Sequence, residues 1–66
     1  MKIMLNGKKT EIDDGLKLTD LIAARGLEPE RLVVEYNYNI AKREDWDNIC
    51  LKESDNLEVL RFVGGG

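Results

Sequence analysis

Apolar and polar residues alternate in several short stretches of this chain, whereas one stretch near residue 20 repeats its apolar residues every three or four positions. Strict alternation is typical of a half-buried β-strand, because successive side chains point to opposite faces of a sheet. It predicts strands over 1–5, 8–12, 32–36 and 57–62, with brief strands at 40–41 and 49–51. In the helical stretch, Leu18, Leu21 and Ile22 form an apolar stripe, which predicts one short amphipathic helix.

Turn residues separate these stretches. Asn6 and Gly7 lie between the first two strands, where a two-residue type I′ turn needs positive φ at both positions. Gly26 follows the helix where a left-handed cap is expected, and Pro29 prevents the helix from resuming. The first two strands are therefore expected to form a hairpin, and the polar strand 8–12 suits a sheet edge.

The order of the elements is hairpin, helix, strand, irregular segment and strand. This order predicts an α+β fold, a β-grasp (ubiquitin-like) roll in which a mixed four- to five-stranded sheet packs on one main helix. The first and last strands are expected to lie side by side at its centre. The domain is expected to span 1–62, followed by a flexible C-terminal glycine tail at 63–66. Two separate hairpins plus a helix are the alternative, but an isolated hairpin is marginally stable at best.

Two residues near position 48 have an expected place in the core. Trp46 is the one large apolar side chain in the polar segment 42–48, and we expect it to plug one end of the core. Cys50 is expected to be a buried or half-buried small hydrophobe between Ile49 and Leu51. The acidic residues of the segment are expected to form a solvated face rather than a general acid–base pair: Glu44, Asp45 and Asp47.

Length, charge and composition narrow the range of functions that this chain could have. The 66 residues allow one domain with a thin core, because a chain this short buries only about 60% of its extended surface. A net charge of −3 disfavours a nucleic-acid binder. The chain shows no apolar run long enough for a membrane span and no signal peptide, so we expect a cytoplasmic protein. The single cysteine and the absence of histidine disfavour a disulfide, a cysteine metal site and a self-contained enzyme.

The end of the sequence offers candidate chemistry. Val63 is followed by Gly64, Gly65 and Gly66, and an extended tail from Val63 to Gly66 reaches about 13 Å. Such a tail, free of side chains, fits a narrow channel in a partner's active site, where the carboxylate of Gly66 would be the working group. A carboxylate is a poor electrophile, so attack on the α-phosphate of ATP, giving an acyl-adenylate, is the expected activation. A frayed end without function is the alternative.

The last strand has two different faces. Leu57 and Val59 share one face, and Leu60 and Phe62 share the other. If the first pair faces the helix, the second pair lies on the outer sheet face beside the tail. Exposed apolar side chains gathered there would form a docking patch.

Taken together, the motifs resemble one family along the whole chain. The chain is similar to the sulfur carrier proteins of thiamine biosynthesis, the ThiS family. The resemblance rests on the following pieces, in this order: 1–3 with Asn6-Gly7, Gly15 before 18–22, 26–31, 34–37, 43–46, Leu51, Asp55, and 57–66.

The resemblance implies a β-grasp carrier that is not itself an enzyme, binds no cofactor or metal, and is a monomer when free. Gly66 would be adenylated by an E1-like adenylyltransferase (ThiF type) that uses ATP. Sulfur from a cysteine desulfurase persulfide would then replace AMP, leaving a thiocarboxylate that donates sulfur to thiazole synthase (ThiG type). Gly64 and Gly65 would thread the partner channels, and the residues expected to dock on the partners are Leu60, Phe62 and Val63.

The sequence departs from the family pattern in three turns. The family often has Gly where this chain has Tyr38, Pro near Lys42, and Gly where this chain has Ser54. These departures concern the shapes of loops rather than the chemistry of the tail.

Other functions share the same tail. One is the small subunit of molybdopterin synthase, and another is a sulfur carrier for a different product, such as thiolated tRNA or cysteine. A ubiquitin-like modifier would undergo the same activation but pass its carboxyl carbon to a lysine amine. A passive interaction module with an inert tail is a further class.

Overall fold

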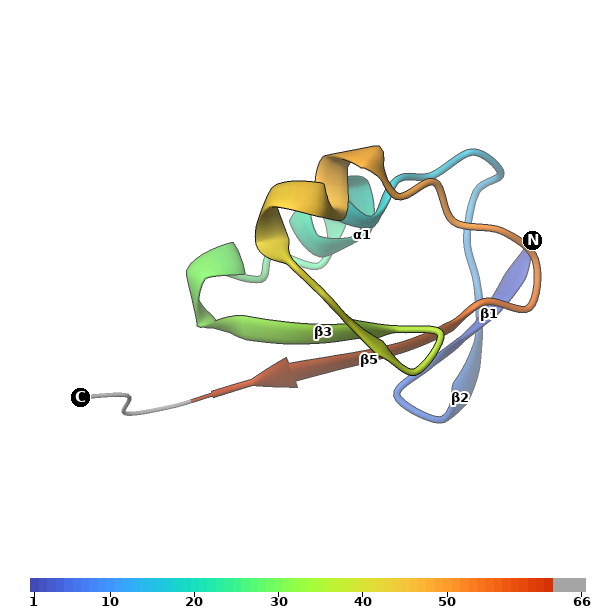
Figure 1. The fold of residues 1–66 in the computed structure, drawn as a ribbon. Helices are drawn as coiled ribbons and strands as arrows, with labels where there is room; N and C mark the ends of the chain where they lie inside the picture. Colours follow the sequence, from blue (N-terminus) through green and yellow to red (C-terminus); the bar gives the residue numbers. More distant parts are fainter. Residues whose placement is uncertain (63–66) are drawn as a thin grey trace.

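The computed structural model describes residues 1–62, which form one mixed sheet, one α-helix and two 3₁₀ helices (Figure 1). The strands are β1 (Lys2–Leu5), β2 (Lys8–Glu11), β3 (Leu32–Tyr36), β4 (Asn39–Ala41) and β5 (Asn56–Arg61). The helix α1 spans Leu18–Ala24, and the 3₁₀ helices are η1 (Pro29–Arg31) and η2 (Arg43–Asn48). Within residues 1–62, α1 and η2 lie on the same side of the sheet (Figure 1).

The strand order in the sheet is β2-β1-β5-β3-β4. β5 is therefore the central strand, and it pairs in parallel with β1 and antiparallel with β3. The outer pairs, β1–β2 and β3–β4, are both antiparallel. The predicted mixed sheet with adjacent first and last strands is confirmed. The alternative of two separate hairpins is wrong, because β5 inserts between them and joins both into one sheet.

Positive φ angles occur at the predicted turns. Asn6 and Gly7 have φ of 51° and 80°, in keeping with the predicted hairpin turn between β1 and β2. Gly26 has φ of 67° just after α1. Its N–H donates to the Ala23 carbonyl at 3.0 Å, and the Leu27 N–H donates to the Ile22 carbonyl at 3.2 Å, so the helix ends in a capped turn.

The core lies between α1 and the inner face of the sheet. Trp46 of η2 closes one end of it with 2% of its surface exposed, and its Nε1–H donates to the Ala41 carbonyl at 2.8 Å. The predicted role of Trp46 is thus confirmed. The buried apolar residues are Ile3, Leu5, Leu18, Leu21, Ile22, Leu32, Val34, Trp46, Leu51 and Leu57.

Three predictions for the region around residue 48 are wrong. The segment expected to be irregular contains the 3₁₀ helix η2, and 49–51 forms no strand but one isolated bridge between Lys17 and Cys50. Cys50 is exposed rather than buried. The backbone here is extended, so neighbouring side chains point in opposite directions, and the buried position belongs to Leu51, which is 2% exposed.

Among residues 1–62, no helix is both long enough and apolar enough to cross a membrane.

Candidate docking and transfer site

The candidate site is built around the last residues of β5, which lead to the glycines. Val63, Gly64, Gly65 and Gly66 lie outside the described residues, so their predicted roles and the predicted flexible tail stay predictions. The structure does show what precedes them. Arg61 is the last residue of β5, and Phe62 follows it (Figure 1).

On one side, β3 holds β5 up to its end. The two strands pair from Tyr36–Leu57 to Leu32–Arg61. One more hydrogen bond extends the pairing, because the Phe62 N–H donates to the Arg31 carbonyl of η1 at 3.0 Å. The backbone is therefore held in register to the last described residue.

On the other side, β1 ends early and a side chain continues its pairing. β1 meets β5 only at two positions, Met4–Asn56 and Leu5–Leu57. Beyond them, the Val59 N–H donates to Asn6 Oδ1 at 2.7 Å, and Asn6 Nδ2 donates to the Val59 carbonyl at 3.2 Å. Asn6 thus supplies the donor and acceptor that a further strand residue would have supplied. From the sequence, Asn6 is identifiable only as a turn residue, because nothing near it in the chain indicates a contact with Val59.

The start of β5 is held by a polar network around Asp55, which is 6% exposed. Its carboxylate accepts hydrogen bonds from Tyr36 Oη at 2.8 Å, Asn37 Nδ2 at 3.2 Å and the Lys52 N–H at 2.8 Å. Asn37 Oδ1 in turn accepts the N–H of Asn56 at 2.8 Å. This network joins the β3–β4 turn to the residues that precede β5.

The network shifts the pKa values of two side chains. Burial is the largest influence on the Asp55 carboxyl and raises its pKa, but the three donors and the Lys52 ammonium outweigh it, so the pKa lies below its usual value. Burial and the hydrogen bond to Asp55 raise the pKa of Tyr36 to about 12. Both groups therefore keep their paired forms, carboxylate and phenol, at neutral pH.

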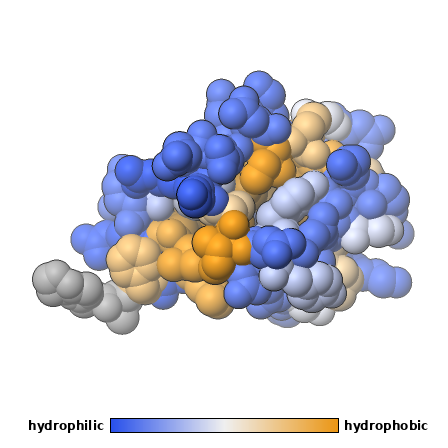
Figure 2. All heavy atoms as spheres, viewed as in Figure 1, coloured by the Kyte–Doolittle hydropathy of each residue, from blue (hydrophilic) through white to orange (hydrophobic). Residues whose placement is uncertain are grey.

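The outer face of the sheet carries an apolar surface beside the end of β5. Leu60 is 52% exposed and Phe62 is 47% exposed, while Leu57 and Val59 face the core, so the predicted division of the two faces is confirmed. Val33 of β3 lies directly opposite Leu60. We call Val33, Leu60 and Phe62 the outer patch. Figure 2 shows apolar side chains gathered at the end of the molecule where β5 ends, with hydrophilic residues around them.

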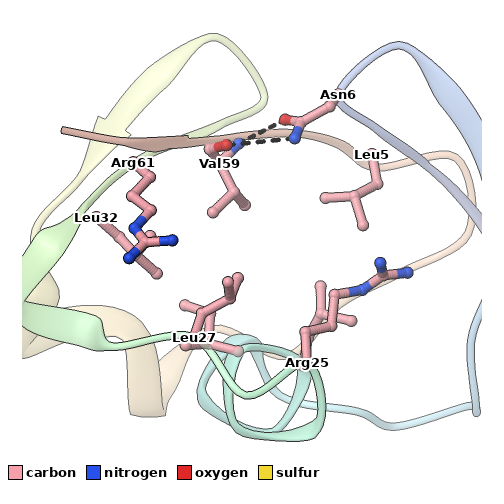
Figure 3. Close-up of a pocket in the computed structure, with 9 residues that line it drawn as sticks. Leu5, Asn6, Arg25, Leu27, Leu32, Val59 and Arg61 are labelled. Atoms are coloured by element: carbon pink, nitrogen blue, oxygen red, sulfur yellow. Dashed lines mark hydrogen bonds between the residues drawn. The ribbon is translucent and has the colours of Figure 1, made fainter. Parts of the chain in front are cut away.

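A concave surface opens on the opposite, inner face of the sheet. It is a groove of about 260 Å³ between α1 and the inner sheet residues near the end of β5. Figure 3 shows the side chains of Arg25 and Arg61 extending into its opening from opposite walls. The residues that line the groove are Leu5, Asn6, Leu21, Ile22, Arg25, Leu27, Leu32, Val59 and Arg61.

The fold and the held end of β5 define a small β-grasp, ubiquitin-like protein. Comparisons with known proteins give the family. Residues 3–66 match the sequence model of the ThiS family. The chain belongs to this family of sulfur carrier proteins.

Individual relatives agree with this assignment. The sulfur carrier protein ThiS of Bacillus subtilis is 38% identical over 66 residues, which cover 97% of this chain and 98% of that protein. The crystal structure of a thiamine biosynthesis protein (ThiS) from Geobacter metallireducens superposes with a TM-score of 0.86 at 35% identity, over 100% of both chains.

Two other relatives are much longer than this chain. A thiazole synthase of Magnetococcus marinus is 38% identical over 66 residues, and one of Paramagnetospirillum magneticum is 26% identical. The match covers all of this chain but spans only 20% of each thiazole synthase.

Proposed function

We propose that this protein carries sulfur for synthesis of the thiazole ring of thiamine, as a thiocarboxylate on Gly66. The observation that carries the proposal is the match of the whole chain to a segment of two thiazole synthases. A carrier domain joined to the enzyme that consumes its sulfur supports thiazole synthase as the acceptor. The Bacillus subtilis sulfur carrier, matched over 98% of its length, supports a free-standing form of the same domain.

In the proposed reaction, a carboxylate oxygen of Gly66 attacks the α-phosphorus of ATP, and pyrophosphate leaves. An E1-like adenylyltransferase of the ThiF type binds the ATP and catalyses this step. The terminal sulfur of a persulfide, supplied by a cysteine desulfurase, then attacks the acyl carbon and AMP leaves. A thiol reduces the resulting acyl disulfide, which releases the thiocarboxylate on Gly66. The sulfur of the thiocarboxylate is a far stronger nucleophile than an oxygen of the original carboxylate.

The chain itself contributes positioning rather than catalysis. Asn6 and Arg31 hold the two sides of the end of β5, so the tail starts from a fixed place. We propose that Leu60, Phe62 and Val63 contact the partner enzymes and that Gly64 and Gly65 thread their channels. Attachment to a folded domain also keeps the reactive sulfur from diffusing away.

The test is the intact mass of the chain after incubation with ATP, a cognate adenylyltransferase and a sulfur source. Replacement of oxygen by sulfur adds about 16 Da, as does oxidation of a methionine or cysteine. Thiol-specific alkylation must therefore map to Gly66 and vanish in a chain that ends at Gly64. An adenylate that forms branched lysine conjugates instead would favour a ubiquitin-like modifier. Failure to form either species with the cognate enzyme would overturn the proposal.

A further inference from the structure

The groove on the inner face combines an apolar lining with two cationic side chains. Six of the nine lining residues are apolar, and Arg25 and Arg61 extend into the opening from α1's C-terminal end and from the last residue of β5 (Figure 3). Its volume of about 260 Å³ is below the ~300–1,000 Å³ of pockets that enclose small molecules. It fits a protruding side chain of another protein better than a whole free ligand.

The charge of the groove opposes the charge of the protein. The whole chain has a net charge of −3, yet the described residues that line the groove include two arginines and no acidic residue. Within residues 1–62 the ion pairs are Met1–Asp14 and Arg31–Glu28, so neither Arg25 nor Arg61 is paired in that range. Two guanidinium groups at opposite sides of an apolar surface match an apolar segment flanked by carboxylates.

The groove is also close along the chain to Gly66, the residue at which the proposed reaction takes place. Gly66 lies five residues after Arg61 in the sequence, which corresponds to at most ~17 Å of extended chain. Any enzyme that holds Gly66 in its active site must therefore come close to Arg61. The outer patch flanks the end of β5 on one face of the sheet, and the groove flanks it on the other.

We propose that the groove is a second docking site for the adenylyltransferase that receives the tail. It takes a segment of that enzyme in which an apolar side chain enters the groove and neighbouring carboxylates pair with Arg25 and Arg61 at its two sides. This inference rests on the proposed function and adds to it the chemistry of the partner surface. Because an arginine binds a carboxylate through two parallel N–H donors, the site selects orientation as well as charge.

The experiment measures the affinity of the full chain for its cognate adenylyltransferase by titration calorimetry at low and high salt. The test variant is R25Q/R61Q, and the control is K8Q/R43Q, which removes the same two charges from β2 and η2, outside the groove. A third variant, R25K/R61K, keeps the charges but loses the paired donors. Denaturant unfolding of each free variant checks that the fold is retained.

We expect R25Q/R61Q to weaken binding by about tenfold or more and to reduce its salt dependence, because desolvated charge pairs contribute to affinity. The control should bind within about threefold of the parent, since charges at a distance are screened. R25K/R61K should keep the salt dependence but bind more weakly than the parent. A Leu27→Trp variant, which enlarges a half-buried lining residue, should weaken binding without changing the salt dependence.

Other results would overturn the inference. If the parent chain forms the thiocarboxylate but R25Q/R61Q binds the enzyme as tightly as the control does, the groove is not a docking site while the proposed function stands. If the parent chain dimerises in sedimentation and R25Q/R61Q does not, the occupant is a second copy and the proposal is wrong. If the parent chain neither binds the enzyme nor is activated by it, the proposed function is wrong, and the inference about the groove is wrong with it.

Discussion

Glu35 of β3 lies directly opposite Glu58 of β5 on the outer face of the sheet. Residues so placed have Cβ atoms about 4.5–5.5 Å apart, and like charges at this separation destabilise a sheet. Both side chains are half-buried, and neither takes part in an ion pair within residues 1–62. The pair therefore costs stability in the free protein.

Removal of either charge should relieve the repulsion. We expect E35Q and E58Q each to raise the free energy of unfolding by about 0.2–0.5 kcal/mol, and the double variant to gain little more, because one substitution already ends the repulsion. Urea denaturation followed by the fluorescence of buried Trp46 measures this. Strictly additive gains, or a loss in either single variant, would contradict the expected coupling.

The carboxylate of Asp55 should make the fold sensitive to acid. Its pKa is lower in the folded chain than the usual 3.8, so its contribution is complete above about pH 4 and is lost as the pH falls through the folded value. D55N places an amide donor among existing donors and should lose about 1–3 kcal/mol at neutral pH. Its stability should then change less than that of the parent between pH 4 and 2. Equal acid dependence in both proteins would show that other carboxylates control it.

Tyr36 should produce the opposite dependence at alkaline pH. Its pKa is raised from 10.0 to about 12, so its contribution is present below pH 10 and is lost as the pH rises toward 12. Y36F removes the hydrogen bond to Asp55, and its stability should decline less over this range. Y38F is the matched control, because Tyr38 is 80% exposed, and its profile should follow that of the parent. Unfolding in urea at several pH values compares the three proteins.

Two turn residues adopt a conformation that favours glycine. Tyr38 has φ of 73° and Ser54 has φ of 70°, at the positions where the resemblance led us to expect glycine. We expect Y38G and S54G each to stabilise the fold by about 0.5–1 kcal/mol, since glycine adopts positive φ without steric cost. G26A is the reverse test: φ is 67° and an added Cβ meets no atom within 4 Å, so any loss reflects backbone strain alone. Destabilisation by Y38G would show that its side chain contributes more than its backbone costs.

The outer patch should matter for transfer and little for folding. Because Leu60 and Phe62 are about half exposed, L60T/F62T should change the free energy of unfolding by less than ~1 kcal/mol. The rate of thiocarboxylate formation at limiting enzyme should fall by about tenfold or more, as for central contacts of an interface. I40T is the control, because Ile40 is 63% exposed but lies opposite Glu35, outside the outer patch. Equal rates for L60T/F62T and I40T would exclude docking through this patch.

Local pattern was sufficient for much of the fold. The alternation in β5 placed Leu57 and Val59 inside and Leu60 and Phe62 outside, because side chains of a strand alternate between two faces. The hairpin turn at Asn6-Gly7 and the end of α1 at Gly26 followed from backbone preferences that act within a few residues. The roles of the terminal glycines were also inferred from sequence and remain predictions.

Contacts between distant segments were decided only by the tertiary structure. Asn6 continues the pairing of β1 with Val59, 53 residues away, and no local preference specifies that partner. The opposition of Glu35 and Glu58 depends on the register between two strands, and the groove depends on how α1 packs against β5. The prediction for Cys50 was wrong because alternation shows only that Cys50 and Leu51 point in opposite directions. Packing decides which of the two is buried. Sequence alone thus determined the hairpin turn, the end of the helix and the two faces of β5, because these follow from preferences within a few residues. The held end of β5 and the groove beside it arose only when the strands and the helix were assembled.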